Sequence, residues 1–385
     1  MTTSARERVA DRLAALAAEG RDLVTFWGEA DEAVGPHLPH YMGLCWFTLD
    51  PASLLITSHW NAAMPELPPE MLAAEYAGDD VHDIAGVVRS PGGVSTLHEA
   101  AGGDPARSAR WRANIALGGD QELIVALRTP RGDAWGALTV YRTPGEPVFS
   151  ADEIAFAQRI APVLAEGARR ALLLGGARDP DGPDAPGVVV LSPGWDLESA
   201  TPGAERWIDA LPGGDWAAGR LPPSVLAVAG RAARAVDDRD DPREVPLTRV
   251  RTRAGAWAVL HGVTLVTGGD RRVAVIVEPA HPGRIAPLLM SAYGLTEREQ
   301  EVTRLVLQGE STADIARRLV VSSHTVQQHM KAIFEKTGVR SRRDLVGKVF
   351  MAHYEPRVRD NEARAADGRP LRGGPVPGRA PATPA

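Results

Sequence analysis

Cysteine is almost absent from this chain, and its scarcity excludes whole classes of structure. Cys45 is the single cysteine in 385 residues, so neither a disulfide framework nor a zinc site built on cysteine pairs is available. No apolar run is long enough to cross a bilayer. The opening stretch MTTSARERVADRLAALAAEG mixes Arg, Glu and Asp with Ala and Leu, which no secretory signal does. We therefore expect a cytoplasmic protein that does not contact a membrane.

The motifs of several common catalytic sites are also missing. The chain contains no phosphate-binding glycine loop, no HExxH motif and no nucleophile elbow. His281 and His353 are isolated, and we interpret them as structural or surface residues. The sequence predicts no enzyme activity and no cofactor.

An excess of positive charge, expected of a protein coated in nucleic acid, is lacking in the chain as a whole. The net charge is −6. Residues 296–385 nevertheless hold 16 Lys/Arg and 11 Asp/Glu, whereas residues 1–295 hold 27 and 38. An acidic body with a mildly basic C-terminal module is expected if only that module contacts phosphate.

Length and composition divide the chain into three globular segments and a tail. With 44% hydrophobic and 24% charged residues, 385 residues suggest two or three soluble domains. Residues 1–176 contain two strand pairs around short turns and end in a helix with a Ser150/Glu153 capping box. This order of helices and hairpins predicts an α+β domain with an antiparallel sheet.

A second α+β segment, residues 186–280, follows a linker rich in Gly, Pro and Asp. It begins with the strand VVVLS, continues through LESATPGAERWIDAL as a short strand and a helix, and ends in three strand patterns. Residues 291–354 are helical by pattern. Residues 355–385 are rich in Arg, Gly and Pro with almost no large apolar residue, which predicts a disordered tail.

Four residues suited to helix N-caps divide the helical segment, and three of them precede an acidic residue by three positions. They are Thr296, Ser311, Ser322 and Ser341. Helices are therefore expected at 297–308, 312–319, 323–336 and 342–353. Only three residues join the second and third helices, and so short a turn forces the sharp crossing of a helix-turn-helix.

The third helix separates its side chains by type. Its apolar stripe is Val326, Met330 and Ile333. A solvated helix face usually carries Glu and Lys pairs, but the opposite face here carries His324, Gln327, Gln328 and Lys331. Gln can bind adenine through two hydrogen bonds, and Lys can donate to guanine or to phosphate. We predict that these four side chains read base edges.

Other residues around this helix are predicted to contact phosphates, because they are cationic or cap the helix starts. They are Ser311, Ser322, Thr325, Lys336, Arg340, Arg342 and Arg343. The alternative for the segment is a helical dimerisation domain with a polar outer face, which amphipathicity alone allows but the capped spacing does not favour.

The stretch LTEREQEVTRLVLQGESTADIARRLVVSSHTVQQHMKAIFEKTGVRSRRDLV closely resembles the LuxR-type helix-turn-helix of bacterial transcription regulators. The matching positions are Leu295, Thr296, Glu299, Glu301, Val302, Gly309, Ile315, Ala316, Leu319, Ser322, Thr325, Val326, His329, Lys331, Ile333, Lys336, Val339, Arg342 and Leu345. The resemblance implies that Gln327, Gln328 and Lys331 enter the major groove. It also implies a dimer formed through the fourth helix, where the contact residues would be Leu345, Val346 and Val349.

Residues 1–176 resemble a GAF-type sensory domain in their first strand pair, in the hairpin ELIVALRTPRGDAWGALTVYR and in the closing helix FSADEIAFAQRIAPVLA. Residues 186–280 resemble a PAS-like domain, with WDLESATPGAERWIDAL where that fold turns from strand into helix. The complete arrangement resembles LuxR-family regulators of high-GC Gram-positive bacteria. A receiver domain is not expected, because hairpins replace its alternating strands and helices.

Both sensory folds often hold small molecules between sheet and helices. Candidate pocket walls are Trp46, Trp60, Tyr76, Trp111 and Trp135. The same aromatic residues can instead fill the core of a domain that binds nothing. A loop cluster shows no ligand pair at a recognised metal spacing, so we interpret it as a cap and turn cluster and predict no metal site. Its members are Asp79, Asp80, His82, Asp83, His98 and Glu99.

The sequence thus predicts a multidomain protein in which α+β sensory domains (GAF-like, PAS-like) precede an all-α four-helix helix-turn-helix domain. Its expected function is dimeric, sequence-specific DNA-binding transcription regulation. The expected partners are double-stranded DNA and a second copy, with RNA polymerase and a small-molecule effector as further candidates. Two alternatives stay open. One is a ligand-sensing protein that signals through protein-protein contacts, and the other is a sigma-factor-like promoter reader, which needs a strand-melting helical domain.

Overall fold

The computed structural model describes nine stretches of the chain, residues 5–63, 75–76, 80–173, 183, 185–234, 245–267, 270–280, 282–348 and 361–369. They form two compact units. Unit 1 comprises residues 1–175, 187–253 and 259–277, and unit 2 comprises residues 176–186, 254–258 and 278–385. None of the helices within these stretches has the length and apolarity needed to span a membrane.

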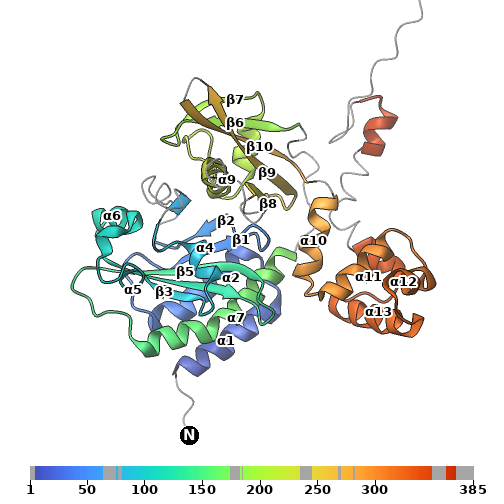
Figure 1. The fold of residues 1–385 in the computed structure, drawn as a ribbon, viewed down its shortest axis with the longest axis horizontal. Coiled ribbons are helices and arrows are strands. Elements are labelled where there is room, and N and C mark those ends of the chain that lie inside the picture. Colours follow the sequence, from blue (N-terminus) through green and yellow to red (C-terminus); the bar gives the residue numbers. More distant parts are fainter. Residues whose placement is uncertain are drawn as a thin grey trace, which may run out of the picture. The chain divides into compact units, whose positions relative to one another are not determined.

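The first sheet of unit 1 has the strand order β2-β1-β5-β4-β3, with antiparallel pairing throughout (Figure 1). Its strands are β1 Cys45–Leu49, β2 Ile56–Trp60, β3 Val94–Thr96, β4 Gln121–Arg128 and β5 Ala134–Arg142. The β1–β2 and β4–β5 hairpins confirm the two strand pairs expected from the sequence.

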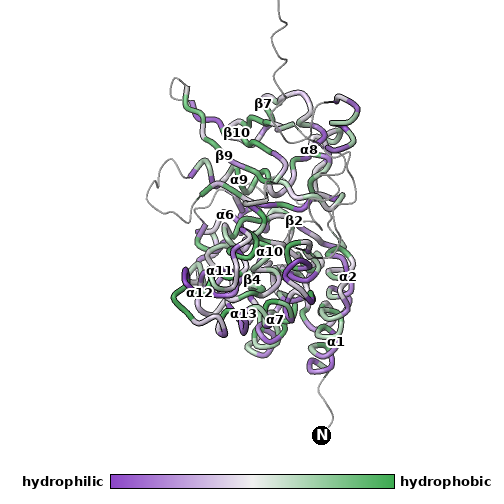
Figure 2. The backbone as a smooth tube through the Cα atoms, turned by 90° about the vertical axis from the view of Figure 1, so that its right-hand side faces the viewer, coloured by the Kyte–Doolittle hydropathy of each residue, from purple (hydrophilic) through white to green (hydrophobic). Residues whose placement is uncertain are grey.

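Three long helices pack together beside this sheet, with α1 and α7 running side by side (Figure 1). They are α1 Ala5–Glu19, α2 Leu23–Val34 and α7 Ala151–Leu173. The predicted capping box begins α7, since the Ser150 N–H donates to Glu153 Oε2 at 2.8 Å and the Glu153 N–H donates to Ser150 Oγ at 3.3 Å. The tube in Figure 2 changes repeatedly between hydrophilic and hydrophobic along α1, as expected of a helix that buries one face.

One short 3₁₀ helix, η1 Gly35–His37, precedes the first strand, and other short helices connect the strands of the first sheet. The connecting helices are the 3₁₀ helix η2 Pro105–Arg107 and the α-helices α4 Ile84–Arg89, α5 Leu97–Ala100 and α6 Ala109–Ala116. Of these, α4 and α5 pack against β3 and β4.

The second sheet of unit 1 has the order β7-β6-β10-β9-β8. Its strands are β6 Gly187–Leu191, β7 Leu197–Ala200, β8 Leu247–Arg251, β9 Trp257–Thr267 and β10 Asp270–Pro279, and its helices are α8 Ala204–Ala210 and α9 Pro223–Arg234. Counted along the chain within each sheet, the strands of both sheets follow the order 2-1-5-4-3. The sequence predicted the strands of the second sheet but not this shared order.

The two sheets belong to the same compact unit. The carboxylate of Asp50, in the β1–β2 turn, accepts hydrogen bonds from Arg249 Nε at 2.8 Å and Arg249 Nη2 at 2.6 Å, and both side chains are buried. Helix α9 packs against β2 and β8. Whether residues 1–176 and 186–280 are separable domains stays a prediction.

Unit 2 contains five helices in residues 282–348, around one apolar core. They are α10 Pro282–Ala292, α11 Glu297–Leu307, α12 Thr312–Leu319, α13 Ser323–Thr337 and α14 Arg342–Val346. The expected start of the domain, residue 291, falls inside α10, whose Met290 is fully buried in this core.

The expected linker and tail fall largely outside the described residues. In the described part of the tail, residues 361–366 are helical, which differs from the disorder expected there. Their sequence, NEARAA, consists mostly of residues with high helix propensity.

Candidate nucleic-acid interface

Each helix from α11 to α14 begins at its predicted N-cap. The side-chain oxygens of Thr296, Ser311, Ser322 and Ser341 each accept the backbone N–H three residues later. Gly309 and Gly338 have φ of +86° and +67°, as expected where helices end in the left-handed region. Because these signals are local, the bounds of α11, α12 and α13 agree with the sequence prediction to within one residue.

The turn between α12 and α13 has the predicted three residues but an unexpected backbone. Val320 has φ +55° and ψ +50°, the left-handed conformation that favours glycine, and its side chain is 89% exposed. The Val321 N–H donates to the Ala316 carbonyl at 3.0 Å, and Arg298 Nη2 donates to the Leu319 carbonyl at 2.8 Å. These bonds close the turn between the two helices.

Helix α13 exposes the predicted reading face. Val326 and Ile333 are fully buried in the core of unit 2, and Met330 is half-buried against it. The four residues predicted to read bases are all exposed, and they are His324, Gln327, Gln328 and Lys331. Gln328 Nε2 lies 3.1 Å from His324 Nε2, and because an amide nitrogen can only donate, the hydrogen bond forms when His324 Nε2 carries no proton.

The residues predicted to contact phosphates fall into two groups. Ser311, Ser322, Arg340 and Arg343 are exposed, and Thr325 is half-buried with its Oγ1 2.8 Å from Ser322 Oγ.

The second group already has partners inside unit 2. Lys336 Nζ lies 2.6 Å from Glu299 Oε1, and Arg342 Nη2 donates to the Glu310 carbonyl. Glu299 is 5% exposed. The sequence indicated its place in a capping box but not its burial.

The predicted dimer contacts occupy different environments. Leu345 is fully buried in the core of its own domain, so its side chain is not available to a second copy. Val346 is half-buried, and Val349 lies outside the described residues.

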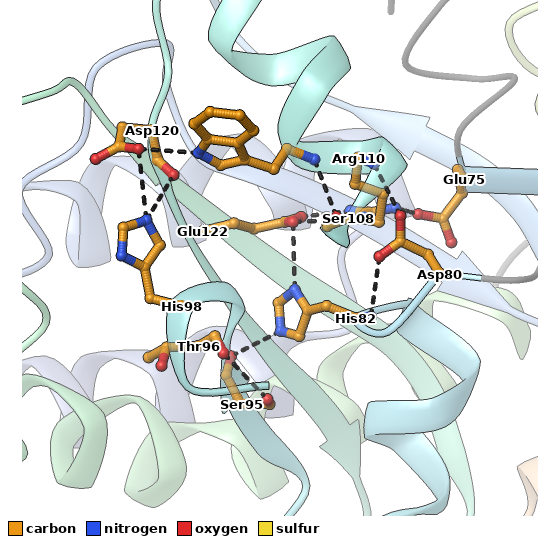
Figure 3. Close-up of polar contacts among 11 residues, drawn as sticks. Glu75, Asp80, His82, Ser95, Thr96, His98, Ser108, Arg110, Asp120 and Glu122 are labelled. Atoms are coloured by element: carbon orange, nitrogen blue, oxygen red, sulfur yellow. Dashed lines mark hydrogen bonds and ion pairs between the residues drawn. The ribbon is translucent and has the colours of Figure 1, made fainter. Parts of the chain in front are cut away.

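A second concentration of charged side chains lies in unit 1 (Figure 3). Arg110 Nε of α6 donates to Glu122 Oε2 of β4 at 3.2 Å, and Arg110 also pairs with Glu75. His82 Nδ1 lies 3.4 Å from Glu122 Oε2, and His82 Nε2 lies 3.2 Å from the Ser95 carbonyl oxygen. All four of the charged side chains are largely buried.

Both ring nitrogens of His82 face oxygen atoms that can only accept, so the imidazolium alone satisfies both contacts. Burial by itself lowers the pKa of His82, but the hydrogen bond and charge of Glu122 outweigh burial, and the pKa lies above its ordinary value. For Glu122, burial acts in the opposite direction and raises the pKa. The Arg110 guanidinium outweighs burial and holds the pKa of Glu122 at about 2.

The described members of the loop cluster serve as caps and ion-pair partners. Asp80 accepts the N–H groups of His82 at 3.0 Å and Arg110 at 2.8 Å, and Asp83 caps α4. His98 lies 3.4 Å from Asp120, and Glu99 lies 3.5 Å from Thr96 Oγ1. Asp79 is not among the described residues. Within the part of the chain that is described, no three His, Cys, Asp or Glu side chains are placed to share a metal ion.

The aromatic residues proposed as pocket walls have separate surroundings. Trp46 is fully buried, stacks on Trp27 with ring centroids 5.0 Å apart and donates to Asp31. Trp135 is fully buried and Tyr76 nearly so, whereas Trp60 and Trp111 are half-buried. Trp46 and Trp135 thus fill the core, and a ligand pocket stays a prediction.

Comparison with known proteins places the C-terminal helices in a family. The model for "Bacterial regulatory proteins, luxR family" matches residues 294–349. Spore germination protein GerE of Bacillus subtilis is 40% identical over 52 residues, which are 14% of this chain and 70% of GerE. The HTH-type relative Mb0914c of Mycobacterium bovis is 50% identical over 52 residues, 14% of this chain and 6% of that protein.

The chain therefore spans only a small part of the first relatives that it matches. A solved structure, the Vibrio cholera VqmA-Ligand-DNA complex, is 18% identical with a TM-score of 0.20, covering 45% of this chain and 84% of VqmA. The match over most of GerE is sufficient, and through its C-terminal helices this chain belongs to the LuxR family of bacterial regulatory proteins.

Proposed function

We propose that the chain is a sequence-specific DNA-binding transcription regulator that reads the major groove with α13. One observation carries the proposal, namely that His324, Gln327, Gln328 and Lys331 are exposed opposite the buried Val326 and Ile333. None of the four is a carboxylate, which phosphates would repel. Relatives named as transcriptional regulators, from Klebsiella aerogenes and Bacillus subtilis, support the same function.

The contacts inside unit 2 refine which residues would bind phosphate. Arg340 and Arg343 are exposed, and we assign phosphate contact to them first, together with the N-termini of α12 and α13. Lys336 and Arg342 have partners inside unit 2, so we do not assign phosphate contacts to them.

We further propose that the protein acts in the cytoplasm as a homodimer formed through α14, with unit 1 as the regulatory part. The shared strand order of the two sheets supports the proposal that residues 1–176 and 186–280 are GAF-like and PAS-like sensory segments. A small-molecule effector and RNA polymerase are its further proposed partners.

Selection of the full-length chain on a pool of random duplexes tests the DNA-binding function. We expect one enriched sequence. On it, Gln327→Ala or Gln328→Ala should cost about 1–3 kcal/mol of binding free energy and relax the preference at one base pair. Enrichment of no sequence would favour the alternative of a signalling protein whose helical module makes only protein contacts.

A further inference from the structure

The ammonium group of Lys336 lies in the ion pair that joins the last turn of α13 to the first turn of α11. Its Nζ is 2.6 Å from Glu299 Oε1. The Glu299 carboxylate also accepts the Thr296 N–H at 2.7 Å, which completes the capping box of α11. One buried carboxylate thus holds both the start of α11 and the end of α13.

The surroundings of this pair make it costly to lose one partner. Glu299 is 5% exposed, and the Lys336 side chain is 28% exposed. Burial raises the pKa of Glu299, but the Lys336 and Thr296 contacts outweigh it and hold the carboxyl ionised. A buried carboxylate that loses its cation is strongly destabilised. The positions of the two charges also suit the dipoles of their helices, negative at an N-terminus and positive at a C-terminus.

The Lys336–Glu299 ion pair lies far enough along α13 from the reading residues that a small tilt of the helix at the pair displaces those residues. Lys336 follows Gln328 by eight residues, which is about 12 Å along a helix axis. A tilt of α13 by about 5° at this ion pair would move the Gln328 side chain by about 1 Å, and displacements of that size matter for directed hydrogen bonds.

We propose that Lys336 is a positioning residue for base reading, which sets the tilt of α13 through Glu299 and does not contact phosphate. This inference rests on the proposed function. It reverses the role predicted for Lys336 from the sequence and assigns a use to the buried Glu299.

The experiment measures binding of full-length protein to the selected duplex, and to duplexes with single base-pair changes, over a range of salt concentrations. The variants are Lys336→Met, which keeps the stem without the charge, and Lys336→Arg, which restores the charge. Arg343→Met is the matched control, because Arg343 is exposed and shows no ion pair with any described residue. Thermal unfolding of each variant, alone and with Glu299→Gln, reports the pair without DNA.

For Lys336→Met we expect affinity for the selected duplex to fall between about 5- and 50-fold, with less discrimination between duplexes and an unchanged salt slope. Lys336→Arg should recover most of the discrimination. Arg343→Met should weaken binding to every duplex alike and flatten the salt slope by about 0.9. In unfolding, Lys336→Met and Glu299→Gln should be strongly non-additive.

Two results for Lys336→Met would overturn the inference. One is a salt slope flattened by about 0.9 with equal loss on all duplexes, the behaviour of a phosphate contact. The other is unchanged discrimination despite lower stability, which would leave the pair with a structural role alone. Failure of the proposed function itself is a distinct result, in which the wild-type protein selects no duplex while the two substitutions still couple in unfolding.

Discussion

Val320 has a backbone conformation that nothing in the sequence pattern indicates. A β-branched residue in the left-handed region is strained by about 1–2 kcal/mol, and most helix ends of this kind use glycine or asparagine. The short turn to Ser322 requires the conformation, whatever residue stands there. Sequence reasoning found the length of the turn but not its strain, because the strain belongs to the backbone path and not to the residue type.

Replacing Val320 with Asn should therefore stabilise unit 2. The side chain is 89% exposed, so little burial is lost, and Asn tolerates the left-handed region. We expect the free energy of unfolding to rise by about 0.5–1 kcal/mol, measured by thermal denaturation. Val321→Asn is the control and should destabilise, because Val321 packs against the core. A lower stability for Val320→Asn would show that the valine side chain makes a contact that outweighs the strain.

The buried His82 predicts a pH dependence for unit 1. Its pKa in the folded state lies above the value of about 6.5 expected in the unfolded chain. Its contribution to stability is therefore fully present below about pH 6.5 and is lost as pH rises through the folded-state pKa. Among the charged groups that face it, Glu122 and Asp80 favour the imidazolium, and Glu122 remains ionised throughout this range.

Urea unfolding between pH 6 and 9, followed by tryptophan fluorescence, measures this dependence. We expect His82→Gln to remove most of the decline in unfolding free energy that the wild-type protein shows on the alkaline side. His98→Gln is matched to it, since His98 also lies 3.4 Å from a carboxylate but its side chain is 36% exposed. If His82→Gln and the wild type decline in parallel, the imidazolium assignment is wrong.

At the scale of elements, local signals decided which helices the sequence could predict. The N-caps of α11, α12 and α13 and the glycines after α11 and α13 fix their bounds without reference to the rest of the fold. Helix α9 was missed because its sequence starts at a Pro pair and contains Gly230, which are signals typical of a loop, although residues 223–232 are all buried. The reading face of α13 was predictable, because burial of Val326 and Ile333 determines which side chains remain outside.

Contacts between distant elements could not be predicted in the same way. The identity of the Lys336 partner depends on how α11 and α13 cross, and the partner of His82 lies on β4, 40 positions later in the chain. Polar residues around a loop therefore suggested caps, which the structure contains, but not the buried ion pairs beside them. The sequence marks charged residues without showing which of them folding buries.

At the scale of the whole molecule, the buried Asp50–Arg249 pair joins the two sheets of unit 1 directly, in addition to the chain that connects them. Its partners are 199 residues apart, and the Asp50 carboxylate accepts the backbone N–H of Arg249 at 3.0 Å as well as the guanidinium. Removing Asp50 takes from the buried Arg249 guanidinium the carboxylate that accepts two of its hydrogen bonds, and breaking a buried ion pair in this way is costly.

We expect Asp50→Ala to lower the free energy of unfolding of unit 1 by about 3–5 kcal/mol. Arg272→Met is the control, because the Arg272–Glu198 pair is more than a third exposed and exposed pairs contribute little to stability. Chemical denaturation of both variants makes the comparison. Equal losses in the two variants would show that Asp50 and Arg249 do not hold the sheets together.

The central claim is that α13 places its exposed side chains in the major groove of DNA. Dimethyl sulfate footprinting of the full-length protein on its selected duplex tests this most directly, since the reagent attacks guanine N7 in the major groove and adenine N3 in the minor groove. We predict protection at guanine N7 within the selected sequence, and its loss at one position in Lys331→Ala, because Lys331 is the reading side chain that can donate to guanine. Protection confined to adenine N3, with every guanine N7 still reactive, would contradict the account.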